Sequence, residues 1–73
     1  MPRKSLDLHG VHHEDVERTV IRFVEENWRS NEEIEIITGD SSRMRDIVST
    51  VLSEYQLDFR LDQSYTKIYT TLE

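Results

Sequence analysis

Hydrophobic residues recur with helical spacing in two stretches of the chain. The first runs from about His13 to Trp28, and the second follows Gly39. Apolar side chains three and four positions apart fall on one face of a helix, so each stretch predicts an amphipathic helix. The first stripe contains Val16, Val20, Phe23 and Val24, with Ile21 and Trp28 at its edges, and the second contains Met44, Ile47, Val48, Val51, Leu52 and Tyr55.

Four shorter stretches have the pattern of β-strands. Ser5–Leu8 and Glu33–Ile37 each precede one of the helices, and Leu57–Leu61 and Tyr65–Leu72 follow the second helix. Alternating apolar residues and flanking turn residues are typical of strands. We expect Leu6 and Leu8 to face the helices and Ile68 and Leu72 to point inward, while Leu57, Phe59 and Leu61 share one side of their strand.

The resulting order of elements, βαβαββ, predicts an α/β fold. Each strand-helix-strand step is expected to cross over with a right hand. Both helices then cover the same face of a mixed four-stranded sheet, which makes a two-layer sandwich. The length of 73 residues allows one domain, so we assign residues 1–73 to a single unit.

Composition narrows the functional classes. The net charge of -6 argues against tight, unaided binding to nucleic acid, because phosphate neutralisation by basic side chains supplies most non-specific affinity. Cysteine is absent, which excludes disulfides and thiolate metal sites and fits an intracellular chain. No apolar run is long enough for a membrane span, and no signal peptide is visible at the start of the sequence. We therefore expect a cytoplasmic protein without a membrane partner.

The first candidate site is the sequence Asp7-Leu8-His9-Gly10. Residues two apart on a strand point to the same face, so Asp7 and His9 share the face opposite Leu8. A carboxylate beside an imidazole can orient the ring and raise its basicity. Gly10 then permits a tight turn or the close approach of another chain. From spacing alone, two polar residues on an exposed sheet face are the alternative interpretation.

The second candidate site begins at Thr38-Gly39, where the second predicted strand leads into the second helix. Free amides at a helix start favour an anion, and Ser41 or Ser42 is suited to cap that helix. Arg43 and Arg45 in the first turn would add positive charge. An ordinary turn with an N-cap is the alternative. Because parallel strands end at one edge, both candidate sites should meet there, where open α/β sheets bind ligands.

Three further features invite interpretation. The run His9-Gly10-Val11-His12-His13 is rich in imidazole, but its spacing matches no standard zinc site, so we expect His12 at the helix N-cap and no structural metal. Alternation over Tyr65, Lys67 and Tyr69 gives either a stacking platform for bases or ordinary strand surface. Trp28 is expected to close the core at the end of the first helix.

Taken together, the run Leu6-Asp7-Leu8-His9-Gly10, an amphipathic helix, a strand ending in Thr38-Gly39 and a second helix beginning near Met44-Arg45 resemble the Smr (small MutS-related) domain family. The resemblance covers about residues 5–72. It implies a βαβαββ sandwich and endonuclease activity on DNA or RNA. The D-x-H motif of the family falls on Asp7 and His9, and its T-G-x-G motif on Thr38 and Gly39, with Ser41 in place of the second glycine.

Two functions follow as hypotheses. In the first, the domain is an endonuclease that cleaves phosphodiesters, with Asp7 and His9 as catalytic residues and with Gly10, Thr38, Gly39, Ser41, Arg43 and Arg45 binding nucleic acid. No cofactor is required by the sequence, and a Mg²⁺ requirement stays open. In the second, the domain is a non-catalytic module that binds nucleic acid or a ribosome- or repair-associated protein. The intact Asp7-His9 pair favours the first hypothesis, while Ser41 and the acidic charge favour the second.

Overall fold

A computed structural model describes residues 4–72 of the chain. The order of elements confirms the βαβαββ prediction. The elements are β1 (Lys4–Asp7), α1 (His13–Glu26), β2 (Glu33–Ile37), α2 (Ser42–Glu54), β3 (Phe59–Leu61) and β4 (Lys67–Thr71). The strand Glu33–Ile37 has the bounds that the alternation predicted.

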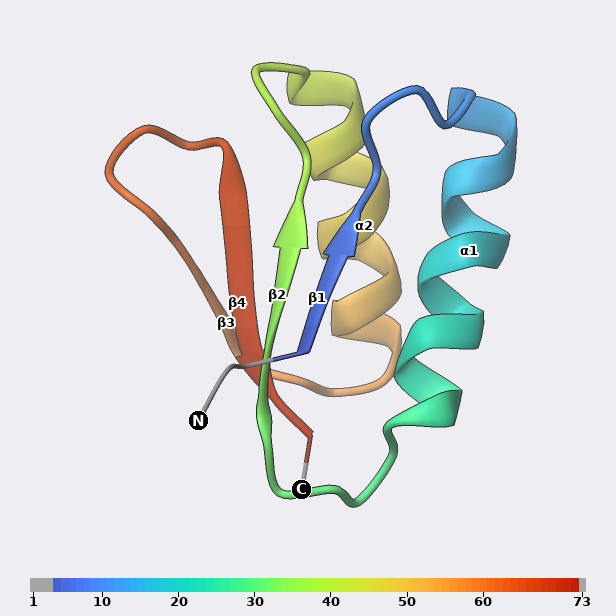
Figure 1. The fold of residues 1–73 in the computed structure, drawn as a ribbon, viewed down its shortest axis with the longest axis vertical. Coiled ribbons are helices and arrows are strands. Elements are labelled where there is room, and N and C mark those ends of the chain that lie inside the picture. Colours follow the sequence, from blue (N-terminus) through green and yellow to red (C-terminus); the bar gives the residue numbers. More distant parts are fainter. Residues whose placement is uncertain (1–3, 73) are drawn as a thin grey trace.

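The four strands form one mixed sheet in the order β1-β2-β4-β3. β1 and β2 are parallel, with Asp7 paired to Ile37 at the end of the ladder. β4 is antiparallel to both of its neighbours, β2 and β3. Both helices lie on the same side of the sheet, as Figure 1 shows, so the fold is the predicted two-layer sandwich. This topology brings the carboxyl ends of β1 and β2 to one edge.

The core lies between the helices and the sheet. Its fully buried side chains come from the predicted stripes of both helices and from the inward positions of the strands. Burying one such aliphatic side chain stabilises the fold by about 1.5–3 kcal/mol. The buried hydrophobic residues are Leu8, Val16, Val20, Val24, Ile34, Ile36, Met44, Val48, Val51, Leu52, Ile68 and Leu72. Between residues 4 and 72 no helix has the length and apolar content needed to cross a bilayer.

The end of α1 corrects one prediction. The helix stops at Glu26, and the Nδ2 atom of its C-cap residue, Asn27, donates a hydrogen bond to the carbonyl of Phe23 at 2.8 Å. Arg29 then takes a left-handed backbone conformation with φ of 63°. Trp28 therefore does not close the core, and 40% of its surface is exposed. Its ring packs instead against Tyr55, with the centroids 5.6 Å apart.

The last two strands are shorter than predicted. After α2 the chain reverses at Gln56, which has φ of 59°, and the amide of Leu57 bonds back to Leu52, so β3 begins only at Phe59. Tyr65 lies in the β3–β4 turn with φ of 61°, and it therefore does not continue the alternation of β4. β3 is an edge strand whose three residues are all exposed. The expected strand Ser5–Leu8 is likewise shifted by one residue.

Candidate functional site at the carboxyl edge of β1 and β2

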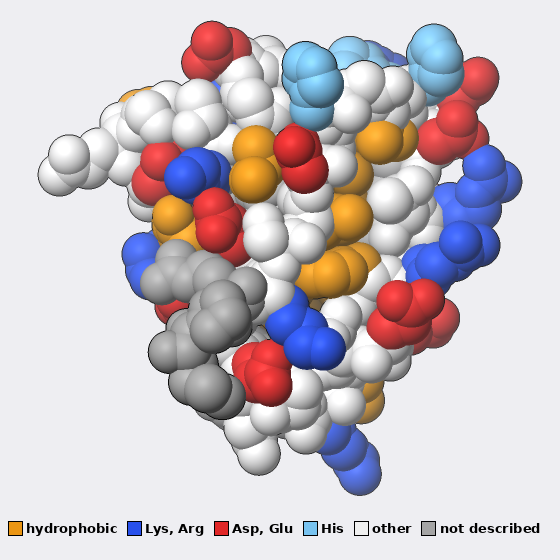
Figure 2. Space-filling model, in the orientation of Figure 1, with side chains coloured by type: hydrophobic (Ala, Val, Ile, Leu, Met, Phe, Trp, Pro, Cys, Tyr) orange, Lys and Arg blue, Asp and Glu red, His pale blue; other side chains and the backbone are white. Residues whose placement is uncertain are grey.

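A hollow of about 410 Å³ opens where β1 and β2 end. Because the two strands are parallel neighbours, the loops that follow them leave the sheet side by side. The predicted site residues that line this hollow are Asp7, His9, Gly10, Thr38, Gly39 and Ser41. The structure thus brings both candidate sequences together at one edge. Histidine side chains gather along this edge in Figure 2.

Asp7 and His9 are both exposed, with the buried Leu8 between them; Asp7 is the last residue of β1, and His9 lies in the turn that follows. The Oδ1 atom of Asp7 accepts a hydrogen bond from the backbone amide of His9 at 2.8 Å. Among residues 4–72, no hydrogen bond joins the carboxylate of Asp7 to the imidazole of His9. Asp7 therefore fixes the turn that carries His9, and the imidazole itself is open to solvent and to a ligand.

Gly10 and Gly39 shape the two loops of the hollow. Their φ angles are +79° and +66°, in the left-handed region that other residues adopt only with strain. A Cβ atom built on either glycine would meet nothing within 4 Å. The glycines are therefore needed for backbone conformation, and the space beside them is open to a ligand.

Thr38 has a structural position in the hollow. Its side chain is buried, and its Oγ1 donates toward the carbonyl oxygens of Thr66 and Gly39, each at 3.2 Å. The backbone amides of Thr38 and Gly39 also donate to the Thr66 carbonyl, at 2.8 and 3.1 Å. The β3–β4 loop thus holds the Thr38-Gly39 turn in place. Thr38 therefore contributes to a ligand site by holding Gly39 in position.

Ser41 is the N-cap of α2, one of the two serines that the sequence predicted for this position. Its Oγ accepts a hydrogen bond from the amide of Met44 at 3.1 Å. Within the described chain, the amides of Ser42 and Arg43 make no hydrogen bond, so they are free to bind an anion at the start of the helix. The capping hydroxyl leaves two of the helix-start amides for a ligand.

His13 is a residue at this edge that the sequence reasoning did not assign to the site. Its Nε2 atom lies 3.5 Å from the Oγ of Ser41. This contact joins the beginning of α1 to the N-cap of α2, and it places a second imidazole beside the hollow. The only sequence signal for it was the cluster of histidines after Gly10. His12 occupies the N-cap position of α1, as expected, without a side-chain capping bond.

The two predicted arginines differ in position. The Nη1 atom of Arg45 donates to the carbonyl oxygen of Tyr65 at 2.8 Å and lies 3.5 Å from that of Gly39. Arg45 thus ties the β3–β4 loop to the hollow and does not line it. Arg43 is exposed and also lies outside the lining. Of the charged residues with described positions, the lining contains the carboxylates of Asp7 and Asp40 and no lysine or arginine.

The side chains around the hollow offer two carboxylates as possible ligands for a metal ion. No group of three or more histidine, aspartate or glutamate side chains in residues 4–72 is arranged to hold a metal ion. Asp7 and Asp40 line the same hollow, however, and Mg²⁺ is commonly held by one or two carboxylates together with water and substrate phosphate. These are the two residues that could hold Mg²⁺ at this site.

The face of β4 that could serve as a stacking platform for bases already makes contacts within the domain. The guanidinium of Arg60 lies over the ring of Tyr69, 4.5 Å from its centroid, and Lys67 forms an ion pair with Glu35 at 3.4 Å. Tyr65, in the turn, is not part of this face. Base stacking on β4 would require Arg60 to move from the ring of Tyr69.

Neither the protein-family models nor the curated proteins nor the solved structures contain a match to this chain. The chemistry open to the domain is therefore inferred from the hollow and from the residues that line it.

Proposed function

We propose that the domain is a nucleic-acid endonuclease of the Smr type that cleaves phosphodiester bonds at the carboxyl edge of β1 and β2. The observation that carries the proposal is the convergence of Asp7, His9, Gly10, Thr38, Gly39 and Ser41 around one hollow. These residues come from two segments about thirty positions apart in the chain, and the fold brings the two segments together at one edge of the sheet. We further propose a cytoplasmic location, on the sequence argument alone.

In this proposal His9 transfers the proton. An exposed imidazole can take the proton from the attacking hydroxyl group or give one to the leaving oxygen, and histidine is the side chain that most often performs either step. Asp7 acts as a positioning residue, because its carboxylate holds the backbone amide of His9. The ring can then reach a phosphate from a turn with a fixed shape.

The phosphate would be bound by backbone groups. The free amides of Ser42 and Arg43 stand at the positive end of the α2 dipole, and the open space at Gly39 lets a phosphate approach them. Amides placed in this way also stabilise the negative charge that develops on the phosphate oxygens during cleavage. The exposed side chain of Arg43 would contact a neighbouring phosphate outside the hollow.

A second candidate function is a non-catalytic module that binds nucleic acid or a ribosome- or repair-associated protein. One observation favours its protein-binding form. The hollow is lined by the carboxylates of Asp7 and Asp40, and like charge repels a phosphate unless a cation intervenes. Mg²⁺ held by these carboxylates would relieve the repulsion. Cleavage that requires Mg²⁺ would therefore favour the nuclease over the binding module.

The deciding experiment is a cleavage assay with the purified chain on labelled single-stranded RNA, duplex DNA and branched DNA, with and without Mg²⁺. His9→Ala should reduce the cleavage rate by about 10²- to 10⁴-fold, as removal of a proton-transfer group usually does. Its melting temperature should stay unchanged, because His9 is exposed.

The matched control is His12→Ala. It removes another exposed imidazole, one whose side chain makes no capping bond. This variant should cleave at the rate of the unmodified chain. Cleavage by His9→Ala at an unchanged rate would remove His9 from the mechanism. Absence of cleavage on every substrate, with and without Mg²⁺, would make the binding module the better account.

A further inference from the structure

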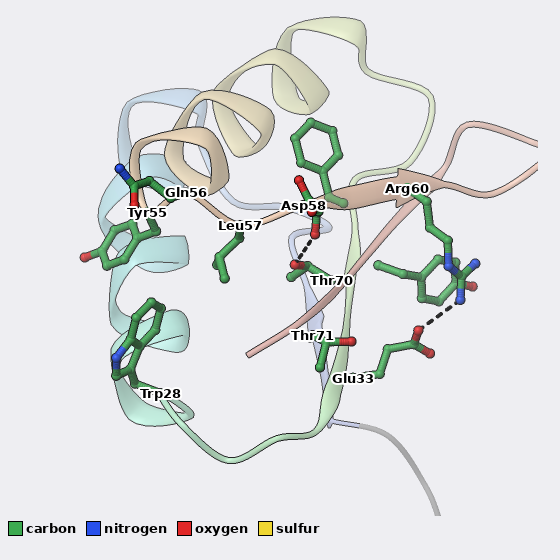
Figure 3. A pocket seen from close by; sticks show the side chains of 11 residues that line it. Trp28, Glu33, Tyr55, Gln56, Leu57, Asp58, Arg60, Thr70 and Thr71 are labelled. Atoms are coloured by element: carbon green, nitrogen blue, oxygen red, sulfur yellow. Dashed lines mark hydrogen bonds and ion pairs between the residues drawn. The ribbon is translucent and has the colours of Figure 1, made fainter. Parts of the chain in front are cut away.

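A second cavity lies at the opposite end of the molecule from the hollow. Both helices begin beside the hollow and run away from it, so α1 and α2 end together at the far end (Figure 1). A groove of about 600 Å³ opens there. Figure 3 shows Trp28 and Tyr55 side by side at one end of it, Leu57 near its middle and Arg60 at the other end. The proposed cleavage uses none of these residues.

The groove exposes aromatic surface. Trp28 is 40% exposed and Phe59 is 36% exposed, and both line the groove. The rings of Trp28 and Tyr55 are tilted by 59° against each other, and both side chains line the groove. Exposed aromatic side chains grouped in a concave surface are typical of docking sites, where tryptophan and tyrosine supply much of the binding energy.

The charge around the aromatic pair is negative. Neither helix has a basic residue in its last turn, although cations are favoured at the negative end of a helix dipole. Glu25, Glu26 and Glu54 stand there instead. The Oη of Tyr55 donates to the Oε2 of Glu25 at 3.4 Å. Partial burial raises the pKa of Tyr55, and the charges of Glu25 and Glu54 raise that pKa further.

The remaining charges of the groove do not cancel this potential. Asp58 adds another carboxylate to the lining. Arg60, the one cation in the lining that the structure describes, is paired with Glu33 at 3.0 Å and lies over the ring of Tyr69. The aromatic end of the groove therefore combines apolar surface with two helix C-termini, and its carboxylates outnumber the one nearby cation, Arg29, which follows Trp28.

We propose that this groove docks a basic segment of another protein that carries an apolar anchor residue. Lysine and arginine side chains of the partner would pair with Glu25, Glu54 and Asp58, while the anchor would pack against Trp28 and Leu57. A cation placed over Trp28 or Tyr55 would also gain from the negative face of the ring. The partner is assigned by charge complementarity, since a basic segment supplies the positive charge that the last turns of both helices lack.

A partner docked in the groove is independent of the proposed nuclease activity, but it would also help the acidic chain to approach nucleic acid. A chain with a net charge of -6 is repelled by nucleic acid. Proteins that bind nucleic acid carry basic segments. Docking on such a segment at the end opposite the hollow would leave the carboxyl edge of β1 and β2 facing outward, next to the nucleic acid that the partner holds.

The test uses the fluorescence of Trp28, which is the single tryptophan of the chain. The probes are a pool of short peptides composed of Lys, Arg, Leu and Phe, and a matched pool with Asp and Glu in place of Lys and Arg. The basic pool should shift the emission of Trp28, and added salt should weaken the effect. The acidic pool should leave the emission unchanged. A third pool, of Lys and Ser only, should bind more weakly than the first.

The matched variants separate the groove from general charge attraction. Glu25→Gln combined with Glu54→Gln should weaken binding of the basic pool at least about fivefold, the usual minimum for an important interface residue. Glu14→Gln combined with Glu17→Gln makes the same charge change on exposed positions of α1 closer to its start, and it should change binding little. Cleavage is not a readout here, so a failed nuclease proposal would leave these results unaffected.

Three results would overturn the inference. The first is no response of Trp28 to the basic pool at low salt. The second is equal weakening by the two pairs of variants, which would show that the net charge alone attracts the peptides. The third is full displacement of the peptides by spermine at an equal concentration of charge, because the groove would then be a site for small cations without a contribution from an apolar anchor.

Discussion

The side-chain Oδ1 of Asp7 accepts a hydrogen bond from the backbone amide of His9, two residues along the chain and 2.8 Å away. This bond assigns Asp7 a role in backbone geometry that the D-x-H spacing alone did not indicate. A side-chain amide oxygen could accept the same bond. The charge of Asp7 and its hydrogen-bonding function can therefore be separated by substitution.

Asp7→Asn is expected to retain most of the cleavage activity, while Asp7→Ala is expected to lose most of it. Asparagine preserves the acceptor for the His9 amide, and alanine removes that acceptor and leaves the turn without its hydrogen bond. The measurement is the cleavage rate of both variants on one substrate, with thermal unfolding to confirm that both are folded. Equal loss in the two variants would mean that the carboxylate charge itself is required, for a proton or for Mg²⁺.

Arg45→Ala should destabilise the fold by about 1 kcal/mol, because the substitution removes a charged donor to the Tyr65 carbonyl. The β3–β4 loop supports the amides of Thr38 and Gly39 through Thr66, so these amides should also exchange hydrogen faster. Denaturant unfolding and amide hydrogen exchange test the two effects. Arg43→Ala is the matched control, since it removes the same charge from an exposed position. Unchanged stability in Arg45→Ala would instead favour a direct role in ligand binding.

Asp62 makes the stability depend on pH at acid values. The hydrogen bond from Ser64 lowers the pKa of Asp62, burial raises it, and bonds from the amides of Lys67 and Thr66 lower it further. Because the pKa is lower in the folded chain, the carboxylate stabilises the fold above the ordinary aspartate pKa. This contribution is lost as the pH falls through the lower, folded value.

Asp62→Asn should therefore lose less stability than the unmodified chain when the pH falls below the ordinary aspartate range. Asparagine keeps the size of the side chain and an oxygen acceptor but cannot titrate. Denaturant unfolding at a series of pH values measures the difference between the two proteins. Identical slopes of stability against pH would show that other carboxylates account for the acid sensitivity.

The sequence predicted the fold where periodic burial decides the structure. The stripes beginning at Val16 and Met44 bury most of the expected side chains, with Phe23, Ile47 and Tyr55 only partly buried, and the strand Glu33–Ile37 has the predicted bounds. The same patterns also required the carboxyl ends of β1 and β2 to meet. The hollow that joins His9 to Gly39 follows from that topology, so the site was predictable in outline.

The sequence did not predict features that depend on a single backbone conformation or a distant partner. Trp28 fits the period of α1, but Asn27 ends the helix and the ring turns outward. Tyr65 fits the alternation of β4, but its positive φ places it in a turn. Arg45 reaches the carbonyl of Tyr65 across twenty residues, a contact that no local pattern encodes. Each of these differences arises where the chain leaves regular structure.

Substitutions of Ser41 can change phosphate binding without a matching change in the stability of the fold. Its Oγ caps α2 by accepting the Met44 amide, and it borders the hollow where the phosphate is proposed to bind. Aspartate caps a helix as well as serine does, and its charge suits the positive end of the helix dipole. Ser41→Asp should therefore fold with unchanged or greater stability. Its negative charge would repel a phosphate at the free amides of Ser42 and Arg43.

Two further variants complete this test. Ser41→Ala loses the cap and should cost about 1 kcal/mol, with the free amides of the helix start still available to a phosphate. Ser41→Gly should cost only a few tenths of a kcal/mol and opens the approach to the same amides, so its cleavage rate should rise.

The measurements are unfolding free energies and cleavage rates for the three variants, and Ser41→Gly combined with His9→Ala serves as the control. If Ser41→Asp cleaves as fast as Ser41→Ala, the phosphate does not bind at the start of α2, and the nuclease site must be sought elsewhere on the edge. A gain in Ser41→Gly that His9→Ala abolishes would instead link the helix start and the imidazole in a single reaction.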